Sequence, residues 1–253
     1  MLVQTILAAV AAVAMVALVA IAFRKYGRTD DEPDGAANAH AGAMLSALFL
    51  LVFAIALIVP WTAADDERRN TGAEAQALVE LYWDTASLPA AARAGVRADV
   101  RGYLDFVVDR EFPALSGGSE ELDQQGWRRL DALRTRLGGL TLSGDRANDA
   151  RDDALERLRE AYAARRQRAV AAGPILPHGV LAFTAITGVI MIFFPFLAGA
   201  RPRGMALVTL GLTAALLGVA IYICFALNHA FTGPLAVKPD AFAAALKELA
   251  RIP

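Results

Sequence analysis

Four long apolar runs and one long polar stretch alternate along the chain. The runs cover residues 2–23, 43–64, 175–198 and 205–227. Each run holds about 20 residues, and a helix of that length spans the roughly 30 Å hydrocarbon core of a bilayer. The stretch 65–173 is rich in charge and keeps a helical period, so it is too polar for lipid and too regular for a linker. The pattern predicts an all-α protein with four transmembrane helices and a soluble helical bundle inserted between the second and third spans.

We therefore expect four consecutive parts. They are a first transmembrane pair at 1–64, a soluble helical domain at 65–173, a second transmembrane pair at 174–227 and a C-terminal tail at 228–253. A cleaved signal peptide is the alternative for the first run, but no charge precedes the run and basic residues follow it, which favours a retained span. Gly211 and Gly218 are seven residues apart on one face of the last run, and this spacing predicts close helix contact.

The polar stretch contains apolar stripes with helical spacing. The clearest stripe consists of Val96, Val100, Tyr103 and Val107. Arginines recur every four residues on the opposite side, from Arg93 to Arg101, as on an amphipathic helix. Pro89 and the glycines after Ser116 predict breaks, and Ser119 is predicted to open the next helix. We expect four helices whose charges form a solvated face, the first and last continuing the second and third spans without a break.

Composition excludes several classes of function. The chain is 56% hydrophobic yet 20% charged, so apolar and charged residues are segregated, and its net charge of −1 gives no basic field for nucleic acid. Cys224 is the only cysteine, which excludes an intrachain disulfide. No catalytic, cofactor-binding or metal-binding motif is present, so we assign no catalytic residue, no cofactor and no metal, and expect no enzyme. The spans lack Asp, Glu, Lys and Arg, which disfavours an ion-coupled transporter and leaves a neutral pore or plain anchoring.

Basic residues do not settle the orientation in the membrane. The two short connectors carry Arg24, Lys25, Arg28, Arg201 and Arg203. The ends of the polar stretch carry Arg68, Arg69, Arg165, Arg166 and Arg168. Positive residues favour the cytoplasm, so the first set places the helical domain outside and the second places it inside. Short loops follow this rule best, so the charge distribution slightly favours a helical domain outside the cytoplasm.

A series of residues resembles the conserved block of the bestrophin-like family of bacterial multi-pass membrane proteins. The matching positions are Glu74, Tyr82, Pro89, Tyr103, Glu111, Pro113, Pro177, Phe231, Gly233 and Pro239. They are accompanied by Arg93, Arg97 and Arg165-Arg166, and the likeness covers residues 42–246. Four motifs depart from the family pattern. Glu111-Phe112-Pro113 stands in place of Glu-Trp-Pro, and Asn228-His229-Ala230-Phe231 stands in place of Asp-X-Pro-Phe. The tryptophan expected near His178-Gly179 is absent, and Trp61-Thr62 stands in place of Trp-Glu.

This resemblance implies a distant likeness to bestrophins, which are pentameric chloride channels with pores lined by aromatic and aliphatic rings. It implies a homo-oligomer in the bacterial inner membrane that passes chloride or other small anions, with the helical domain in the cytoplasm. By this likeness the second span lines the pore, and Phe49 and Phe53, four residues apart on one helix face, are its candidate pore-lining residues. The plainer interpretation is that both rings pack between helices or face lipid.

A second hypothesis is a non-conducting scaffold or sensor whose helical domain binds a partner, which the amphipathic helices favour. The stretch 228–233 also has two interpretations. It either ends the fourth span and docks the tail beside the helical domain, or it is only a helix stop followed by Gly-Pro.

Overall fold

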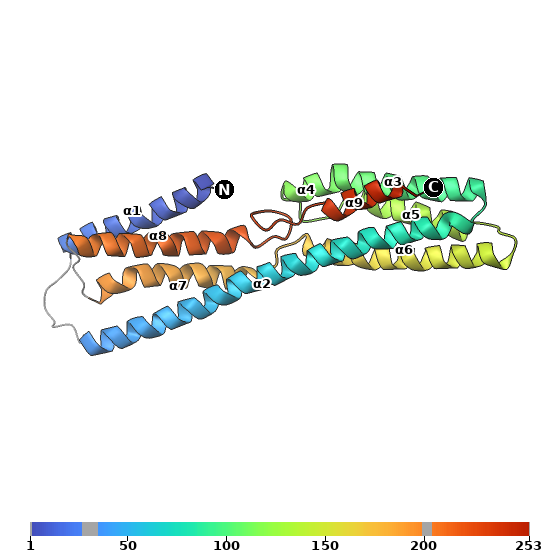
Figure 1. Cartoon of the computed structure of the whole chain (residues 1–253). Helices are drawn as coiled ribbons and strands as arrows, with labels where there is room; N and C mark the ends of the chain where they lie inside the picture. Colours follow the sequence, from blue (N-terminus) through green and yellow to red (C-terminus); the bar gives the residue numbers. More distant parts are fainter. Residues whose placement is uncertain (1, 27–34, 199–203, 253) are drawn as a thin grey trace. The chain divides into compact units, whose positions relative to one another are not determined.

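The computed structural model describes residues 2–26, 35–198 and 204–252, and these residues form helices without any strand (Figure 1). The all-α prediction is confirmed. The chain divides into two compact units, which we call unit 1 (Met1–Trp61 and Leu176–Asn228) and unit 2 (Thr62–Ile175 and His229–Pro253). Helix α2, Gly35–Asp84, contributes residues to both units. Arg28, Arg201 and Arg203, which enter the charge comparison, lie outside the described residues.

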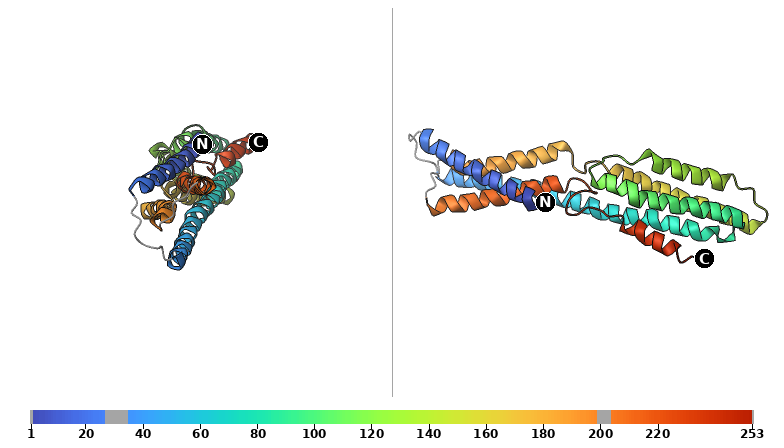
Figure 2. Two further views of the ribbon diagram at one scale, coloured as in Figure 1. Left: turned by 90° about the vertical axis from the view of Figure 1, so that its left-hand side faces the viewer. Right: turned by 90° about the horizontal axis from the view of Figure 1, so that it is seen from above.

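Unit 1 contains the apolar helices. These are α1 (Leu2–Tyr26), the first part of α2, α7 (His178–Leu197) and α8 (Met205–Ala226). Helix α1 lies along α8, and α8 also contacts α7 (Figures 1 and 2). Within the described ranges, α2, α7 and α8 are long and apolar enough to cross a membrane, whereas the apolar part found in α1 is shorter, Ile6–Leu18. The four-span arrangement therefore remains a prediction.

Small residues allow close helix contact in unit 1. A Cβ added to Gly218 would lie 2.8 Å from Ala12 Cβ and 3.0 Å from Ala8 O, because α8 approaches α1 closely at this glycine. A Cβ added to Gly211 would meet no atom within 4 Å. The predicted glycine seam is thus present at Gly218 only. Gly188 on α7 has the same role against Ile221 of α8, where an added Cβ would lie 2.6 Å from Cδ1.

Unit 2 is a bundle of longer and shorter helices. After α2 come η1 (Thr85–Ser87), α3 (Ala90–Phe106), η2 (Val107–Glu111), α4 (Phe112–Ser116), α5 (Gln124–Gly138), α6 (Asp145–Ala171) and α9 (Asp240–Leu249). The predicted stripe from Val96 to Val107 is buried in its core. Helix α5 begins at Gln124 and not at Ser119, because the Asp123 carboxylate caps it by accepting from the Gln125 N–H at 2.7 Å. The prediction that Ser119 opens this helix is wrong.

The continuity predicted between the polar and apolar segments holds at one end only. Helix α2 runs without interruption through Pro60 to Asp84, so the second apolar run and the first polar helix form one element. Helix α6 ends at Ala171 and α7 begins at His178, so the predicted continuity at this end is wrong. The intervening Pro174 and Pro177 lack the N–H that a continuous helix needs, and proline also disfavours the helical conformation of the residue before it.

Candidate functional site

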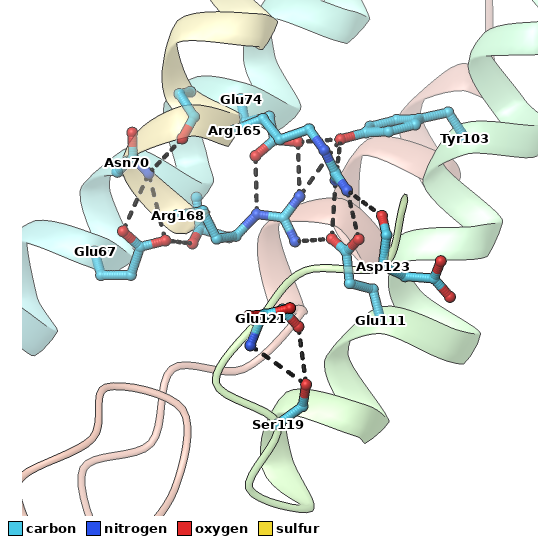
Figure 3. A network of polar contacts seen from close by, with 12 residues as sticks. Glu67, Asn70, Glu74, Tyr103, Glu111, Ser119, Glu121, Asp123, Arg165 and Arg168 are labelled. Atoms are coloured by element: carbon cyan, nitrogen blue, oxygen red, sulfur yellow. Dashed lines mark hydrogen bonds and ion pairs between the residues drawn. The ribbon is translucent and has the colours of Figure 1, made fainter. Parts of the chain in front are cut away.

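The core of unit 2 holds a cluster of charged side chains that we call the ion cluster (Figure 3). Its members are Glu74, Tyr103, Glu111, Arg165 and Arg168. Each is at most 1% exposed, and the two arginines are among the largest fully buried side chains. The prediction that the charges of this stretch form a solvated face is therefore wrong for these residues. Burying charges costs several kcal/mol each unless they are paired and hydrogen-bonded, so the pairing must be close to complete.

Four helical elements bring the ion cluster together. Glu74 comes from α2, Tyr103 from α3, and Arg165 and Arg168 come from α6, where a spacing of three places both on one face. Glu111 ends the π-helix η2. In that wide turn the Phe112 N–H bonds to Val107 O, five residues back. Pro113 follows and has no N–H to offer, which explains why the regular hydrogen-bond ladder is widened just before it.

Arg168 lies at the centre of the ion cluster. Its Nε and Nη2 donate to the two oxygens of Glu74 at 3.0 and 2.9 Å, which makes a two-bonded guanidinium–carboxylate pair. Its Nη1 donates to Glu111 Oε1, so one guanidinium joins α2 to η2. Aromatic rings cover it, with Phe242 of α9 at 5.2 Å and Phe112 at 5.6 Å from the guanidinium carbon.

Arg165 completes the pairing of Glu111. Its Nη1 and Nη2 donate to the two carboxylate oxygens at 2.9 and 2.6 Å, and Nη2 also donates to Asp123 O at 3.2 Å. The Trp127 ring lies 4.7 Å from its guanidinium carbon. Gly126 makes room for this arrangement, since a Cβ there would lie 2.1 Å from Arg165 Nη2.

The charges of the ion cluster balance. Two guanidinium groups face two carboxylates, and the Tyr103 hydroxyl accepts from Arg165 at 2.9 Å while donating to Glu74. Burial, and next the Glu74 carboxylate, raises the pKa of Tyr103 well above its usual value, so the phenol remains neutral. The arrangement therefore joins α2, α3, η2 and α6 by mutual pairing and leaves no charge in excess.

Glu67 extends the polar region by a further carboxyl, which has no cationic partner in hydrogen-bond contact among the residues that the structure describes. It is 4% exposed, lies beyond the apolar run 43–64, and accepts from Asn70 Nδ2 at 3.1 Å and Thr71 Oγ1 at 3.3 Å. Asn70 Nδ2 also donates to Ala164 O of α6 at 3.0 Å. Burial raises the pKa of Glu67 to about 7, which the hydrogen bonds and the charge of Arg168 oppose. Glu67 also lines a hollow of about 470 Å³ between α2 and α6.

The ion cluster has the chemistry of a structural link. Its polar atoms are directed at one another, except the buried Arg165 Nε, which has no hydrogen-bond partner among the described residues. Over the ranges that the structure describes, no group of three or more His, Cys, Asp or Glu side chains could hold a metal ion. Four of the residues that carry the family resemblance meet here: Glu74, Tyr103, Glu111 and Arg165. Sequence reasoning did not identify Arg168 as a member. The signal available was its spacing of three from Arg165 on a helix whose other face is charged.

The candidate pore residues lie in unit 1. Phe49 is 4% exposed and stacks on the half-buried Phe53, with ring centroids 5.8 Å apart. Phe49 also touches α7, since a Cβ added to Gly188 would lie 3.1 Å from its ring. In the single chain both rings thus contribute to an apolar cluster with Ile192 and Phe196. Their role in a pore stays a prediction.

The remaining motif residues mainly shape helix ends and core contacts. Pro89, Pro177 and Pro239 each occupy the position just before a helix begins, at α3, α7 and α9. The Tyr82 ring is buried under the Arg97 guanidinium, 4.3 Å from its centroid. Pro113 lies in the first turn of α4.

The stretch 228–233 follows the end of α8 and makes contacts through Asn228 and Phe231. In unit 1 the Asn228 side chain accepts from the Leu176 N–H at 2.8 Å. In unit 2 the Phe231 ring packs edge-on against Phe112, with centroids 5.7 Å apart, and Gly233 has a φ of +84°, which favours glycine. The docking interpretation of this stretch, in which the tail packs on the helical domain, is confirmed by these contacts.

Comparison with known proteins gives one match. The Bestrophin-like domain matches residues 7–242, which is nearly the whole chain. No curated protein and no solved structure matches it. With its long apolar helices, the chain is a membrane protein that contacts the lipid bilayer. The match extends from α1 through the ion cluster to α9, so the chain belongs to the bestrophin-like family.

Proposed function

We propose that this chain is the subunit of an anion channel that assembles from identical copies in the bacterial inner membrane. Membership of the bestrophin-like family carries the proposal, because the resemblance links that family to chloride channels. Chloride or another small anion is the proposed permeant ion, and five is the proposed number of copies, both taken from that resemblance. No protein cofactor is required for such a pore.

The charge distribution of the spans supports a pore of neutral constrictions. The described parts of α2, α7 and α8 that are long enough to cross a membrane contain no Asp, Glu, Lys or Arg. A channel can select and gate with apolar rings that exclude water, so it does not need a charge at mid-membrane. Helix α2 is the proposed pore helix, with Phe49 and Phe53 as the narrow section. Phe49 is buried against α7 in the single chain, so α2 and α7 would have to rearrange on assembly before its ring could line a pore.

The continuity of helix α2 from residues of unit 1 into residues of unit 2 supports a role for unit 2 in gating. The segment of α2 that crosses the apolar unit continues as the helix that carries Glu74. Through Glu74 the ion cluster holds this helix to α6, so a movement of α6 would be transmitted to α2. We propose that unit 2 holds the pore helix in place and that a ligand or partner acting on unit 2 opens or closes the pore.

Chloride efflux from liposomes that contain the purified full chain tests the proposal. We expect efflux above that of empty liposomes and a change in its rate or anion selectivity in Phe49→Ala and Phe53→Ala. Leu50→Ala is the matched control, since this side chain is exposed on the same helix and its loss leaves the apolar cluster intact. Absence of efflux from the wild type would contradict the channel and favour a non-conducting scaffold. Efflux that both phenylalanine variants leave unchanged would contradict the pore assignment alone.

Reporter fusions decide the orientation. The resemblance places unit 2 in the cytoplasm, whereas the basic residues of the short connectors slightly favour a location outside the cell. A reporter that is active only in the cytoplasm, fused at Gly138 in unit 2 and at the C-terminal Pro253, should be active at both points in the cytoplasmic orientation. Inactivity at both points would place unit 2 outside.

A further inference from the structure

The hollow beside Glu67 lies where the chain passes from apolar to polar segments. All of its lining residues belong to unit 2, and its volume of about 470 Å³ is within the range of pockets that hold small organic molecules. Ala63, near the end of the second apolar run, and Ile175, at the start of the third, both line it. The hollow therefore suits a molecule that has both an apolar and a polar part.

The polar side of the hollow is acidic. Its polar side chains are Asp66, Glu67, Asn70 and Gln167, and no lysine, arginine or histidine is among the described residues that line it. Asp66 is already paired with Arg69, whose Nη2 lies 2.6 Å from Asp66 Oδ1. Glu67 is thus the carboxyl that remains to meet a positive charge inside the hollow.

Glu67 is held less tightly than the carboxylates of the ion cluster. Its oxygens accept from Asn70 at 3.1 and 3.3 Å and from Thr71 at 3.3 Å. The oxygens of Glu74 and Glu111 accept from guanidinium groups at 3.0 Å or less. A carboxylate can accept about four hydrogen bonds, and amide and hydroxyl donors do not neutralise its charge. Glu67 therefore keeps the capacity to bind a cation.

The charges around Glu67 are paired with other groups. Burial raises the pKa of Glu67, and the charge of Arg168 on α6 lowers it while that of Glu74 on α2 raises it. Arg168 is itself paired within the ion cluster. In the C-terminal tail, His229 Nε2 lies 3.4 Å from Glu120 Oε1. A cation that enters the hollow would therefore find Glu67 as its partner.

Apolar groups form the rest of the wall. Val170 of α6 is 83% exposed and lines the hollow together with Ala171, Pro174 and Ile175. Apolar area that is removed from water stabilises a complex roughly in proportion to that area. An inorganic cation would leave this wall in water, so the wall favours a cation that carries an apolar chain.

We propose that this hollow binds an organic ammonium ion, whose charged group pairs with the Glu67 carboxylate while its apolar chain covers Val170 and Ile175. An ammonium group donates three hydrogen bonds, which suits Glu67 and the side-chain oxygens of Asn70 and Gln167. The ligand touches α2 through Glu67 and α6 through Val170, so its binding joins the two helices. A free alkylamine and the headgroup of an aminophospholipid both have this chemistry. The site requires neither ion conduction nor assembly, so it goes beyond the proposed channel.

Calorimetric titration with hexylamine tests the site. The probe is added to the purified full chain in detergent at pH 6 and at pH 8, and a primary amine is charged at both values. We expect about tenfold tighter binding at pH 8, because the ammonium binds the ionised carboxylate and the pKa of Glu67 is about 7. Binding at pH 6 should release about one proton, which makes the heat depend on the ionisation enthalpy of the buffer.

Glu67→Gln removes the charge and keeps the size of the side chain. At pH 8 it should weaken hexylamine binding by about tenfold or more, and the difference between pH 6 and pH 8 should disappear. Glu160→Gln changes an exposed carboxylate outside the hollow and should bind like the wild type. The neutral probe 1-hexanol should bind wild type and Glu67→Gln equally weakly. Circular dichroism confirms that each variant is folded.

Val170→Ser tests the apolar wall. The side chain is exposed, so its loss leaves the core of unit 2 intact, and hexylamine binding should weaken by about fivefold. Ala163→Ser, exposed on the same helix and outside the hollow, is the matched control and should bind like the wild type. Unchanged binding in Val170→Ser would overturn the placement of the apolar chain.

Short-chain lipids separate the two sources of the ammonium group. Binding of dihexanoyl phosphatidylethanolamine that depends on Glu67, without binding of dihexanoyl phosphatidylglycerol, would identify a lipid headgroup as the ligand. Binding of hexylamine alone would identify a free amine. The site is overturned if neither amine binds, or if hexylamine binds wild type and Glu67→Gln alike. Chloride efflux enters none of these outcomes, so failure of the channel proposal leaves the site standing.

Discussion

Unit 1 and unit 2 are both helical, but different forces specify their packing. Ion pairs found among the described residues all lie in unit 2, where buried arginines of α6 pair with buried glutamates of α2 and η2. In unit 1 the threonine side chains bond to their own helices, as Thr184 and Thr187 do by donating to Val180 O and Phe183 O at 2.8 Å. Contact between helices there depends on glycine and alanine.

This difference follows from the surroundings of each unit. Between apolar helices in lipid the hydrophobic effect adds little, so close packing of small residues supplies the attraction. In water, burying apolar stripes drives the bundle together, and a buried network then selects one arrangement among several. The predictions below probe this contrast, starting with the largest effect.

Loss of Arg168 should be the most damaging single change in unit 2. Arg168→Ala leaves the buried Glu74 without its main partner and removes one partner of Glu111, and breaking a buried pair costs about 3–5 kcal/mol. Chemical denaturation of the full chain in detergent, followed by circular dichroism, measures this loss of unfolding free energy.

Arg166→Ala is the matched control for this change. Arg166 is exposed on the same helix, two residues away, so its loss should change stability by less than about 0.5 kcal/mol. If both variants changed stability equally, the ion cluster would contribute nothing specific to the stability of unit 2, and apolar contacts alone would hold the bundle together.

Protonation of Glu67 should make the stability of unit 2 depend on pH near neutrality. Burial raises the pKa of Glu67 from 4.5 to about 7, so the folded state binds the proton more tightly than the unfolded state does. The resulting stabilisation is complete below about pH 4.5 and is lost as the pH rises through about 7, with a total of about 3 kcal/mol. Unfolding curves at pH 5 and pH 8 measure it.

Glu67→Gln isolates this effect from other titrations. The amide resembles the protonated carboxyl, so the variant should match the wild type at pH 5 and exceed it in stability at pH 8. Glu160→Gln changes an exposed carboxylate and should keep the pH dependence of the wild type. A constant difference between wild type and Glu67→Gln across this range would contradict the prediction.

The helical architecture could be predicted from the sequence because the spacing of apolar residues along one helix is a local property of the chain. The run 43–64 and the stripe that follows it lie on one helix, and the structure joins them in α2. The start of α5 was placed too early at Ser119, since Ser119 is occupied in a turn with Glu121 and Asp123 supplies the cap instead. Ser119 and Asp123 can both cap a helix, and their order along the chain does not show which of them does.

The ion cluster could be predicted only in part. The family resemblance includes Glu74, Tyr103, Glu111 and Arg165, but nothing in their local sequence says that they meet. Arg165, Arg166 and Arg168 differ in burial although they are neighbours of one type, because the rotation of α6 turns two of them inward and one outward. Which charges are buried depends on contacts between residues that are 54 to 94 positions apart. The helical period describes only neighbours along one helix, so it carries no information about these contacts.

Gly126→Ala tests whether Arg165 needs a close approach to α5. The added Cβ would lie 2.1 Å from Nη2, so the guanidinium must move away from Glu111. We expect a loss of about 2 kcal/mol in unfolding free energy, as for other overpacked cores. Gly138→Ala on the same helix meets no atom within 4 Å and should be neutral or slightly stabilising. A similar loss of unfolding free energy in both variants would indicate that alanine disturbs the ends of α5 and that the contact with Arg165 is not the cause.

Gly218→Ala makes the corresponding test in unit 1, and here we expect the smallest effect. The new Cβ would lie 2.8 Å from Ala12 Cβ and 3.0 Å from Ala8 O, so α1 and α8 must separate slightly. Alanine also favours the helix by up to about 1 kcal/mol relative to glycine, which offsets part of the strain and leaves a net loss of about 1 kcal/mol. Gly211→Ala gains the same helix preference without a clash and should be neutral or stabilising. The difference between these two variants, measured by thermal unfolding in one detergent, isolates the close contact from helix preference. No difference would mean that small residues do not hold α1 to α8, and the contrast between the two units would then depend on the ion cluster alone.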